Sequence, residues 1–561
     1  MKRKNELIAG AFLAAAAAAY YLFHAGYLAT PSEDYLGNIL PFSTSILSLH
    51  FGDILNKLLP AYPALIAALS TFFGGPDPVL SAALVLNMAL LVPYFAGAYL
   101  IFSKFLSRQM TAAALFFLAV NSYTLYTALN PELEIFLATA TLWTFVLLSR
   151  GSRFDLVTAA VVAVTKWDSV FIVPAVLWKR FFPGLRWKRA FVAGVIASLP
   201  FVVWAAYLFL MKLRDPDSSN VYVSEIARRG PNIYRYLIDA YLVPSGFVQW
   251  AGLDVYASFP SAVSILIAVA AVLFAVLFLA LLAAGIRSFV RTQHELRAPL
   301  AVYIGGFVLI HMVYQNTKDK YVLPIVWFLT LLVFIGLERW LIPVFVRAMK
   351  ERVKRLSVIA LSAFLFAVSL ICVVRTHETA IAAFFAVLSS AWLVWLYSVP
   401  GVRGKVLAAA ALFSLFVIGM DVVYGRTILD HYSRRRVEFK LAGEWLRDNM
   451  KPGDVIVASE ETVLQYYSGI PMSDIYMFMH FPSRDLESLD LCLSAVGAKY
   501  LYIDDFYIRR LVTNDKNALD RKAPLVKKLK SVIDGNPRFT LVKTIHVDPD
   551  INGRIYMVKD Q

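Results

Sequence analysis

Four groups of carboxylates and lysines, far apart in the sequence, are suited to chemistry at a membrane surface. They are Glu33 and Asp34 with Lys57, then Glu132 with Glu134, then Lys166 with Asp168, and last Lys318, Asp319 and Lys320. Ionisable residues are costly to place against a bilayer, so by default they indicate a functional site. Lysines suit a lipid phosphate, and a nearby carboxylate suits deprotonation of an attacking hydroxyl. Together the groups predict transfer of a chemical group from a lipid phosphate to an acceptor outside the membrane.

Each group also has a plainer interpretation when taken alone. The first pair of acids follows Ser32, which is a good helix cap, so this stretch could be a solvated loop. Glu132 and Glu134 could simply favour a helix N-terminus. Lys166 and Asp168 could pair with each other. Only the convergence of all the groups on one side of the membrane favours a site.

The composition indicates a polytopic membrane protein. Of 561 residues, 59% are hydrophobic and 17% are charged, and the mean hydropathy is +0.63. Soluble domains are usually about 45–50% apolar and about 25% charged. Two cysteines, Cys372 and Cys492, are too few for a disulfide framework. From Asp430 onward there are 20 basic and 19 acidic residues, so nearly all of the net charge of +15 lies in the first 429 residues. This distribution fits basic inner loops and gives no support to a nucleic-acid partner.

The basic loops predict the topology. Lys2, Arg3 and Lys4 precede the apolar run Leu7–Ala29, which is long enough to be a retained first span with the N-terminus in the cytoplasm. The same rule predicts about thirteen membrane segments in all, including this first span. The later ones include Val79–Phe102, Met110–Leu129, Ala190–Met211, Pro260–Ile286, Leu300–Tyr314 and Tyr321–Ile342. We therefore expect a multi-pass protein of the cell membrane with an extracytoplasmic C-terminus.

Two apolar segments, Leu156–Thr165 and Val170–Trp178, are too short to cross about 30 Å of hydrocarbon. They flank the polar sequence Thr165-Lys166-Trp167-Asp168-Ser169. We expect a hairpin of short helices whose polar tip lies in a wet cavity open to the outside.

The composition changes at about Asp430, which predicts two domains. Residues 1–429 form the transmembrane domain, and residues 430–561 form a small extracytoplasmic α/β domain. Its expected helices are Glu438–Asn449 and Glu460–Tyr467, and its expected strands are Val455–Ser459, Lys499–Asp504, Phe539–His546 and Arg554–Val558.

The order of several short motifs resembles a known family over roughly residues 1–345. The motifs are Glu33-Asp34-Tyr35, the run Lys57-Leu58-Leu59-Pro60-Ala61-Tyr62-Pro63 through Phe73-Gly74, an acid at Glu132 or Glu134, Lys166, and Lys320-Tyr321-Val322-Leu323-Pro324. In this order the chain resembles the membrane glycosyltransferases of the GT-C fold. The most similar branch holds the protein O-mannosyltransferases and the bacterial lipid A aminoarabinose transferase, which are family 39-like glycosyltransferases. Within that branch the chain resembles prokaryotic members, the archaeal ones in particular.

The motifs also depart from the family pattern. The first acid pair is Glu-Asp where the family usually has Asp-Glu, so which acid acts as the base stays open. Glu replaces the usual Asp of the second outer turn, and Lys320 stands where Arg is frequent. The Trp-Trp-Asp-Tyr-Gly signature of oligosaccharyltransferases is absent from the sequence.

The resemblance implies an inverting glycosyltransferase with a polyprenyl- or dolichyl-phosphate sugar donor, of the hexosyl, mannosyl or aminoarabinosyl type. The acceptor would be a protein, a glycan or a lipid on the outer face. The implied general base is Asp34, with Glu33 second. The implied donor-phosphate ligands are Lys57, Lys318, Lys320 and Tyr321, and the sugar and acceptor pocket would hold Glu132, Glu134, Lys166 and Asp168. The resemblance implies no required cofactor and no essential metal, although acid pairs can bind a divalent ion adventitiously.

Two other classes of function stay open from the sequence. A transporter or flippase of lipid-linked sugars would show broken helices in both halves of the chain, and the short pair occurs in one half only. A scaffold whose outer domain binds a partner would leave the outer acids without a role.

Overall fold

The structure is a computed structural model, and it describes most of the membrane region and most of the tail. The described residues are 30–32, 35–50, 59–75, 77–120, 122–182, 187–214, 261–313, 323–348, 436–458, 462–477, 486–504, 533–548 and 551–559. The chain divides into two compact units. The first holds residues 1–26 and 38–429, and the second holds residues 27–37 and 430–561.

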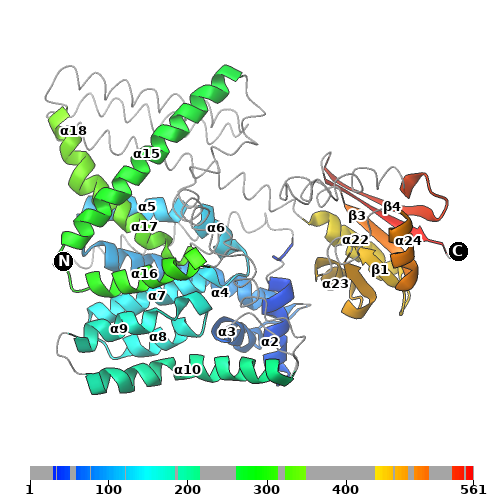
Figure 1. Cartoon of the computed structure of the whole chain (residues 1–561), viewed down its shortest axis with the longest axis horizontal. Helices are drawn as coiled ribbons and strands as arrows, with labels where there is room; N and C mark the ends of the chain where they lie inside the picture. The colour runs from blue at the N-terminus through cyan, green and yellow to red at the C-terminus, as the bar shows by residue number, and fades with distance from the viewer. Residues whose placement is uncertain are drawn as a thin grey trace. The chain divides into compact units, whose positions relative to one another are not determined.

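The described part of the first unit is entirely helical (Figure 1). Its elements are α2 (Leu40–Leu47), α3 (Ala61–Ser70), α4 (Pro78–Phe102), α5 (Arg108–Val120), α6 (Ser122–Leu129), α7 (Glu134–Ser149), α8 (Phe154–Ala163), the 3₁₀ turn η3 (Trp167–Ser169), α9 (Ile172–Phe181), α10 (Trp187–Arg214), α15 (Ser261–Arg291), α16 (Arg297–Val313), α17 (Leu323–Gly336), the π turn η6 (Leu337–Leu341) and α18 (Ile342–Ala348). A further π turn, η2 (Tyr35–Ile39), precedes α2.

Three of the described helical stretches are long and apolar enough to cross a membrane, by length and composition. They are Pro78–Phe102, Trp187–Leu210 and Leu323–Val344. Each coincides with an expected span. The expected spans in residues 1–29 and 349–429 lie outside the described residues, so the number thirteen and the orientation of the termini stay predictions.

The expected span Met110–Leu129 corresponds to α5 and α6. Both stretches are helical, and Asn121 between them lies outside the described residues.

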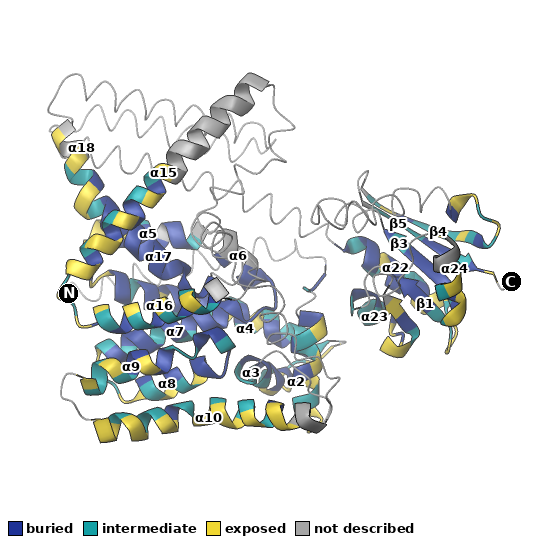
Figure 2. Ribbon diagram, viewed as in Figure 1, coloured by how far each residue is buried: buried dark blue, intermediate teal, exposed yellow. Residues whose placement is uncertain are grey.

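Burial separates a central helix from a peripheral one (Figure 2). Every residue of α17 is buried. Helix α10 instead exposes an apolar face, on which Phe191 is 73% exposed and Ile196 is 65% exposed. An apolar helix that leaves large aliphatic and aromatic side chains uncovered is suited to contact with lipid.

Two glycines allow α15 and α17 to cross with their backbones in contact. A Cβ atom on Gly285 would lie 1.9 Å from the Leu332 carbonyl oxygen, and a Cβ atom on Gly336 would lie 2.0 Å from the Leu281 carbonyl oxygen. No side chain fits at either position. Small residues at such crossings are typical of helices packed within membranes, because close approach maximises van der Waals contact.

The second unit is built on a five-stranded mixed sheet. Its strands are β1 (Val455–Ala458), β2 (Ile475–Met477), β3 (Ala498–Asp504), β4 (Phe539–Asp548) and β5 (Ile551–Val558), in the order β2-β1-β3-β5-β4. The first three are parallel, whereas β5 runs antiparallel to β3 and β4. Its described helices are α22 (Val437–Asn449), α23 (Thr462–Ser468) and α24 (Leu486–Ala495), with a 3₁₀ turn, η7 (Met472–Asp474), before β2.

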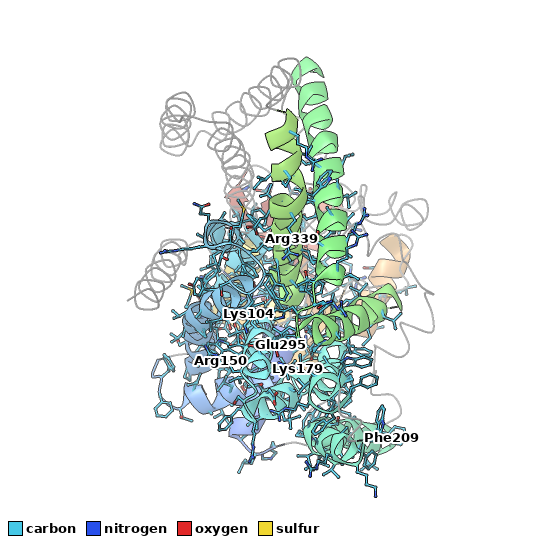
Figure 3. The ribbon with its side chains drawn as sticks, turned by 90° about the vertical axis from the view of Figure 1, so that its left-hand side faces the viewer. Lys104, Arg150, Lys179, Phe209, Glu295 and Arg339 are labelled. Carbon is cyan, nitrogen blue, oxygen red and sulfur yellow. The ribbon has the colours of Figure 1, made fainter. Side chains whose placement is uncertain are left out.

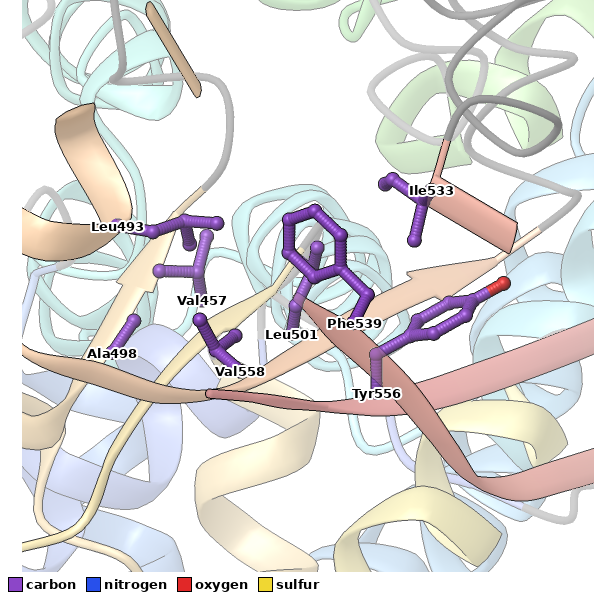
Figure 4. Packing of buried hydrophobic residues seen from close by; sticks show 8 residues of the cluster. All are labelled: Val457, Leu493, Ala498, Leu501, Ile533, Phe539, Tyr556 and Val558. Carbon is purple, nitrogen blue, oxygen red and sulfur yellow. The ribbon is translucent and has the colours of Figure 1, made fainter. Parts of the chain in front are cut away.

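Strand alternation gives this sheet an apolar layer on each face. Tyr502 contacts the ring of Phe439 on α22 at 5.3 Å between centroids. Its neighbour Leu501 belongs to a separate cluster with Leu493 of α24 and Tyr556 of β5 (Figure 4). Successive side chains of a strand point to opposite faces, so helices pack against both sides of the sheet.

The expected elements of the tail are confirmed within two to three residues at their ends. The helices Glu438–Asn449 and Glu460–Tyr467 correspond to α22 and α23, and the four expected strands correspond to β1, β3, β4 and β5. Strand β2 and helix α24 were missed. Three residues are too few to show an alternating pattern, and this explains the omission of β2.

The Asp454 carboxylate gives the second unit an acid-sensitive contact. Burial raises the pKa of Asp454, but the Lys451 backbone N–H and the Lys499 ammonium group, which donate to it at 2.9 Å, lower that pKa below its usual range. A depressed native pKa stabilises the fold above the unfolded pKa of about 3.9, and this contribution disappears as the pH falls through the native value.

We expect Asp454→Asn to lose this pH dependence. Between pH 6 and pH 3 the amides of β1 should lose more hydrogen-exchange protection in the wild type than in the variant, after correction for intrinsic exchange. The exposed carboxylate of Asp448 provides the control, because Asp448→Asn should behave as the wild type. Equal losses of protection in the wild type and both variants would show that Asp454 is not the source of the pH dependence.

Candidate functional site

The expected hairpin of short helices is confirmed. Helices α8 and α9 pack against each other, and η3 forms the turn between them. The Ser169 hydroxyl donates to the Val162 carbonyl at 2.6 Å and so ties the turn to the end of α8. The tip was expected in a wet cavity open to the outside, and in the structure it is largely enclosed: Thr165 and Ser169 are fully buried and Asp168 is 5% exposed, whereas Lys166 and Trp167 are half-buried. Helix α16 packs on η3 and covers it.

Asp168 is bound on two sides through one carboxylate oxygen. Its Oδ2 lies 3.4 Å from the Lys166 ammonium and 3.2 Å from Nε2 of His311, a residue of α16. Nδ1 of His311 lies 2.9 Å from the Phe307 carbonyl oxygen. Both ring nitrogens therefore face oxygen acceptors, and a neutral imidazole can donate from only one of them. The imidazole and the carboxylate must share an additional proton for both contacts to be hydrogen bonds.

Lys166 also contacts a carboxylate from a third helix. Its ammonium lies 3.6 Å from Oε1 of Glu134, the first residue of α7. Glu134 is 3% exposed, and its place in the first turn of α7 is favourable because the helix dipole stabilises an anion there. Lys166 thus joins Asp168 and Glu134, and three of the four expected pocket residues meet in one buried cluster.

The fourth expected pocket residue, Glu132, lies in the turn just before α7 and is buried. Asn87 of α4 fixes this turn. Its amide nitrogen lies 2.7 Å from the Asn130 carbonyl and 2.9 Å from the Glu132 carbonyl. Its amide oxygen accepts from the Tyr62 hydroxyl at 2.8 Å. The acids therefore stand on a rigid turn that α3, α4 and α7 hold in common.

Sequence reasoning missed both His311 and Asn87. Each is a polar residue inside a run that was taken only as a span, Leu300–Tyr314 for the histidine and Val79–Phe102 for the asparagine. A polar side chain within an apolar run is costly unless it has a partner. That rule would have marked both positions.

Helix α16 can approach the hairpin tip because of a glycine. A Cβ atom on Gly306 would lie 2.2 Å from Cγ of Phe171, which directly precedes α9. A Cβ atom on the neighbouring Gly305 would meet no other atom within 4 Å. Only Gly306 therefore sets the distance between α16, which carries His311, and the turn that carries Asp168.

We expect Gly306→Ala to lower the rate of the group transfer that the sequence predicts by up to about 10²-fold. Displacements of about 1 Å at a catalytic site can cost that much in rate. The added methyl group must push α16 away from Phe171, so the contact between His311 and Asp168 lengthens. Gly305→Ala is the matched control and should retain the wild-type rate. The comparison is made on purified proteins with equal folded fractions. Equal rates for the two variants would remove α16 from the site.

The remaining expected site residues lie outside the described residues. They are the implied bases Glu33 and Asp34 and the implied phosphate ligands Lys57, Lys318, Lys320 and Tyr321. The residues flanking the acid pair are described. The Ser32 hydroxyl accepts from the Tyr35 N–H at 3.1 Å, so the interpretation of Ser32 as a helix cap is confirmed.

The acids near Lys166 decide which ligands the site suits. The carboxylates of Glu134 and Asp168 lie within 3.6 Å of its ammonium group, and a third buried acid, Glu132, lies in the turn just before α7. A phosphate would be repelled here, whereas sugar hydroxyls and a developing positive charge would be stabilised. Within the described ranges no three His, Cys, Asp or Glu side chains are placed to hold a metal ion.

Comparison with known proteins identifies the fold. No protein-family model matches the chain, and no curated protein matches it. The crystal structure of ArnT from Cupriavidus metallidurans bound to undecaprenyl phosphate is 13% identical, covers 97% of each chain and has a TM-score of 0.52. Its apo state is 14% identical, covers 99% of this chain and 98% of that chain, and has a TM-score of 0.51.

A more distant similarity is to the Archaeoglobus fulgidus oligosaccharyltransferase tethered with an acceptor peptide. It is 12% identical, the match covers 84% of this chain and 64% of that chain, and the TM-score is 0.46. At such identities the ArnT structures establish the fold alone. The expected GT-C architecture is thereby confirmed.

Proposed function

We propose that the chain is an inverting glycosyltransferase that moves a sugar from a polyprenyl- or dolichyl-phosphate to an acceptor on the outer face of the membrane. The observation that carries the proposal is the buried cluster of Glu134, Lys166, Asp168 and His311 within a fold shared with ArnT. The ArnT structure holds undecaprenyl phosphate, which makes a lipid phosphate the first donor class to test.

The proposed reaction is a single displacement. An acceptor hydroxyl oxygen forms a bond to the anomeric carbon, and the bond from that carbon to the phosphate oxygen breaks. The electron pair of the broken bond leaves with the lipid phosphate, and the hydroxyl proton passes to a carboxylate. Attack opposite the leaving group inverts the configuration at the anomeric carbon.

The proposed roles follow the charges. Asp34 takes the proton, with Glu33 as the alternative base. Lys57, Lys318, Lys320 and Tyr321 bind the donor phosphate. Lys166 does not share that task, because two buried carboxylates already offset its charge.

The described acids are suited to hold the sugar and the acceptor. Oδ1 of Asp168 is buried, and no described residue forms a hydrogen bond with it. An ionised carboxylate oxygen without a partner is costly to bury. A sugar or acceptor hydroxyl that donates to this oxygen would offset that cost, so Asp168 is proposed to orient a substrate hydroxyl through Oδ1.

The tail is proposed to support or gate the site without supplying catalytic groups. Residues 27–37, which contain the first acid pair in sequence, belong to the same compact unit as the tail. Gly37 lies against Thr462 of α23, since a Cβ atom on this glycine would be 3.6 Å from the threonine methyl group. A folded variant lacking the tail should therefore still transfer sugar at a lower rate, and donor binding by the tail alone would oppose this role.

The direct test uses the purified full-length chain and a panel of radiolabelled polyprenyl- and dolichyl-phosphate sugars. Transfer of label to a protein, glycan or lipid acceptor supports the proposal. A flippase would instead move labelled lipid across liposomes without releasing free lipid phosphate. Movement of the labelled lipid without transfer of the sugar would support a transporter and oppose the proposed enzyme.

A further inference from the structure

An apolar groove between α8 and α10 ends at two cationic side chains. Its volume is about 550 Å³, within the range of about 300–1,000 Å³ usual for small-molecule sites. Ala160 of α8 and Ala193 of α10 are among the small residues that make it deep, and Ile196 is one of its larger side chains. Lys188 and Arg189, at the start of α10, close one end.

These two cations differ from the other basic residues near this end of the helices. Lys179 lies 3.1 Å from Glu295 and also donates to the Leu148 carbonyl, and Figure 3 shows it beside Glu295. Lys188 and Arg189 are exposed and have no ion pair or hydrogen bond with any residue that the structure describes. Among the described residues, nothing competes with an anion for these two side chains.

The surroundings of the groove place its basic end at the level of lipid headgroups. Trp178 stacks on Phe182 at 4.1 Å between centroids, and Phe182 contacts Trp187 edge to face at 5.8 Å. Aromatic side chains gather at the interface between membrane and water. From this end α10 continues as an exposed apolar helix. The groove thus joins a hydrocarbon-facing surface to two cations at the interface.

We propose that this groove binds one anionic glycerophospholipid, with a hydrocarbon chain between α8 and α10 and its phosphate on Lys188 and Arg189. The hydrocarbon chain gains little from the groove, because the surrounding lipid is equally apolar. Preference must come from the headgroup, through charge-assisted hydrogen bonds to the two cations. The site is separate from sugar transfer, since the donor lysines Lys57, Lys318 and Lys320 are expected in outer loops and the basic end follows an inner one.

The test is native mass spectrometry of the full-length chain in detergent, titrated with phosphatidylglycerol, phosphatidylcholine and undecaprenyl phosphate. Phosphatidylglycerol should bind most tightly. A Lys or Arg near an anionic lipid surface contributes about 1 kcal/mol, so Lys188→Gln with Arg189→Gln should raise the apparent Kd roughly 10- to 30-fold. Ala193→Phe should also weaken binding, because the ring fills the groove while both cations remain.

Arg287→Gln with Arg291→Gln is the matched control. These arginines lie at the end of α15, away from the groove lining, and the double variant removes the same charge. It should bind phosphatidylglycerol as the wild type does. An equal loss in this control would show general electrostatic attraction and overturn the site. Equal binding of phosphatidylcholine would overturn the role of the cations, and tighter binding of undecaprenyl phosphate would overturn the assigned occupant.

Discussion

Asp34→Asn is expected to lower the turnover of sugar transfer about 10²- to 10⁴-fold, the usual contribution of a general base. An acceptor hydroxyl has a pKa far above 7, so it needs a proton acceptor as its bond to the anomeric carbon forms. Asparagine keeps the size and the hydrogen bonding of the side chain but cannot take the proton. Donor binding should be nearly unchanged, and turnover and binding are measured separately with the same radiolabelled lipid-phosphate sugar.

Two further variants test Glu33 and Lys57, the other charged residues of the first site group in the sequence. Glu33→Gln should cost less turnover than Asp34→Asn. Lys57→Ala should instead weaken donor binding, because it removes a charge-assisted contact to phosphate. A fully active Asp34→Asn with an inactive Glu33→Gln would transfer the role of base to Glu33. Normal transfer by both acid variants would remove this loop from the reaction.

Lys166→Met should lower the free energy of unfolding by about 3–5 kcal/mol, the usual cost of breaking a buried ion pair by removing one partner. The side chains of Glu134 and Asp168 are 4% and 7% exposed, and both lie within 3.6 Å of the lysine ammonium. Without that cation two buried carboxylates repel each other. Thermal unfolding in detergent measures the loss, and sugar transfer should disappear with it.

A double variant separates lost charge balance from lost packing. Lys166→Met with Asp168→Asn removes one charge of each sign, so it should be more stable than Lys166→Met alone. Contacting residues are expected to show such coupling. The exposed residue Lys543 on β4 supplies the control, because Lys543→Met should unfold as the wild type does. If the single and double variants unfold alike, the ion pairs do not hold the hairpin.

Features that depend on a short stretch of chain were predictable. The hairpin of α8 and α9 follows from the length of two apolar runs, because the rise per residue of a helix fixes how far each can reach. The strands of the tail follow from their side-chain pattern. Lys166 and Asp168 were recognised because two opposite charges interrupt an apolar sequence.

Features that depend on contacts between distant segments were not predictable in the same way. His311 reaches Asp168 from α16, and no local pattern connects these two positions. The burial of the hairpin tip depends on Gly306, where the absence of a side chain lets α16 approach. A single glycine in an apolar run does not reveal which ring it accommodates. One sequence without its fold therefore identifies charged residues better than it identifies their neighbours.

The complete burial of α17 has a consequence for the synthesis of the protein in the cell. Helix α17 packs against α15, α7 and α5, and all three precede it in the chain. These partners are synthesised first, so α17 can enter a place prepared among them. Its fit there depends on Gly285 and Gly336. A side chain at either glycine would keep α17 from its partners and leave a fully apolar helix uncovered during synthesis.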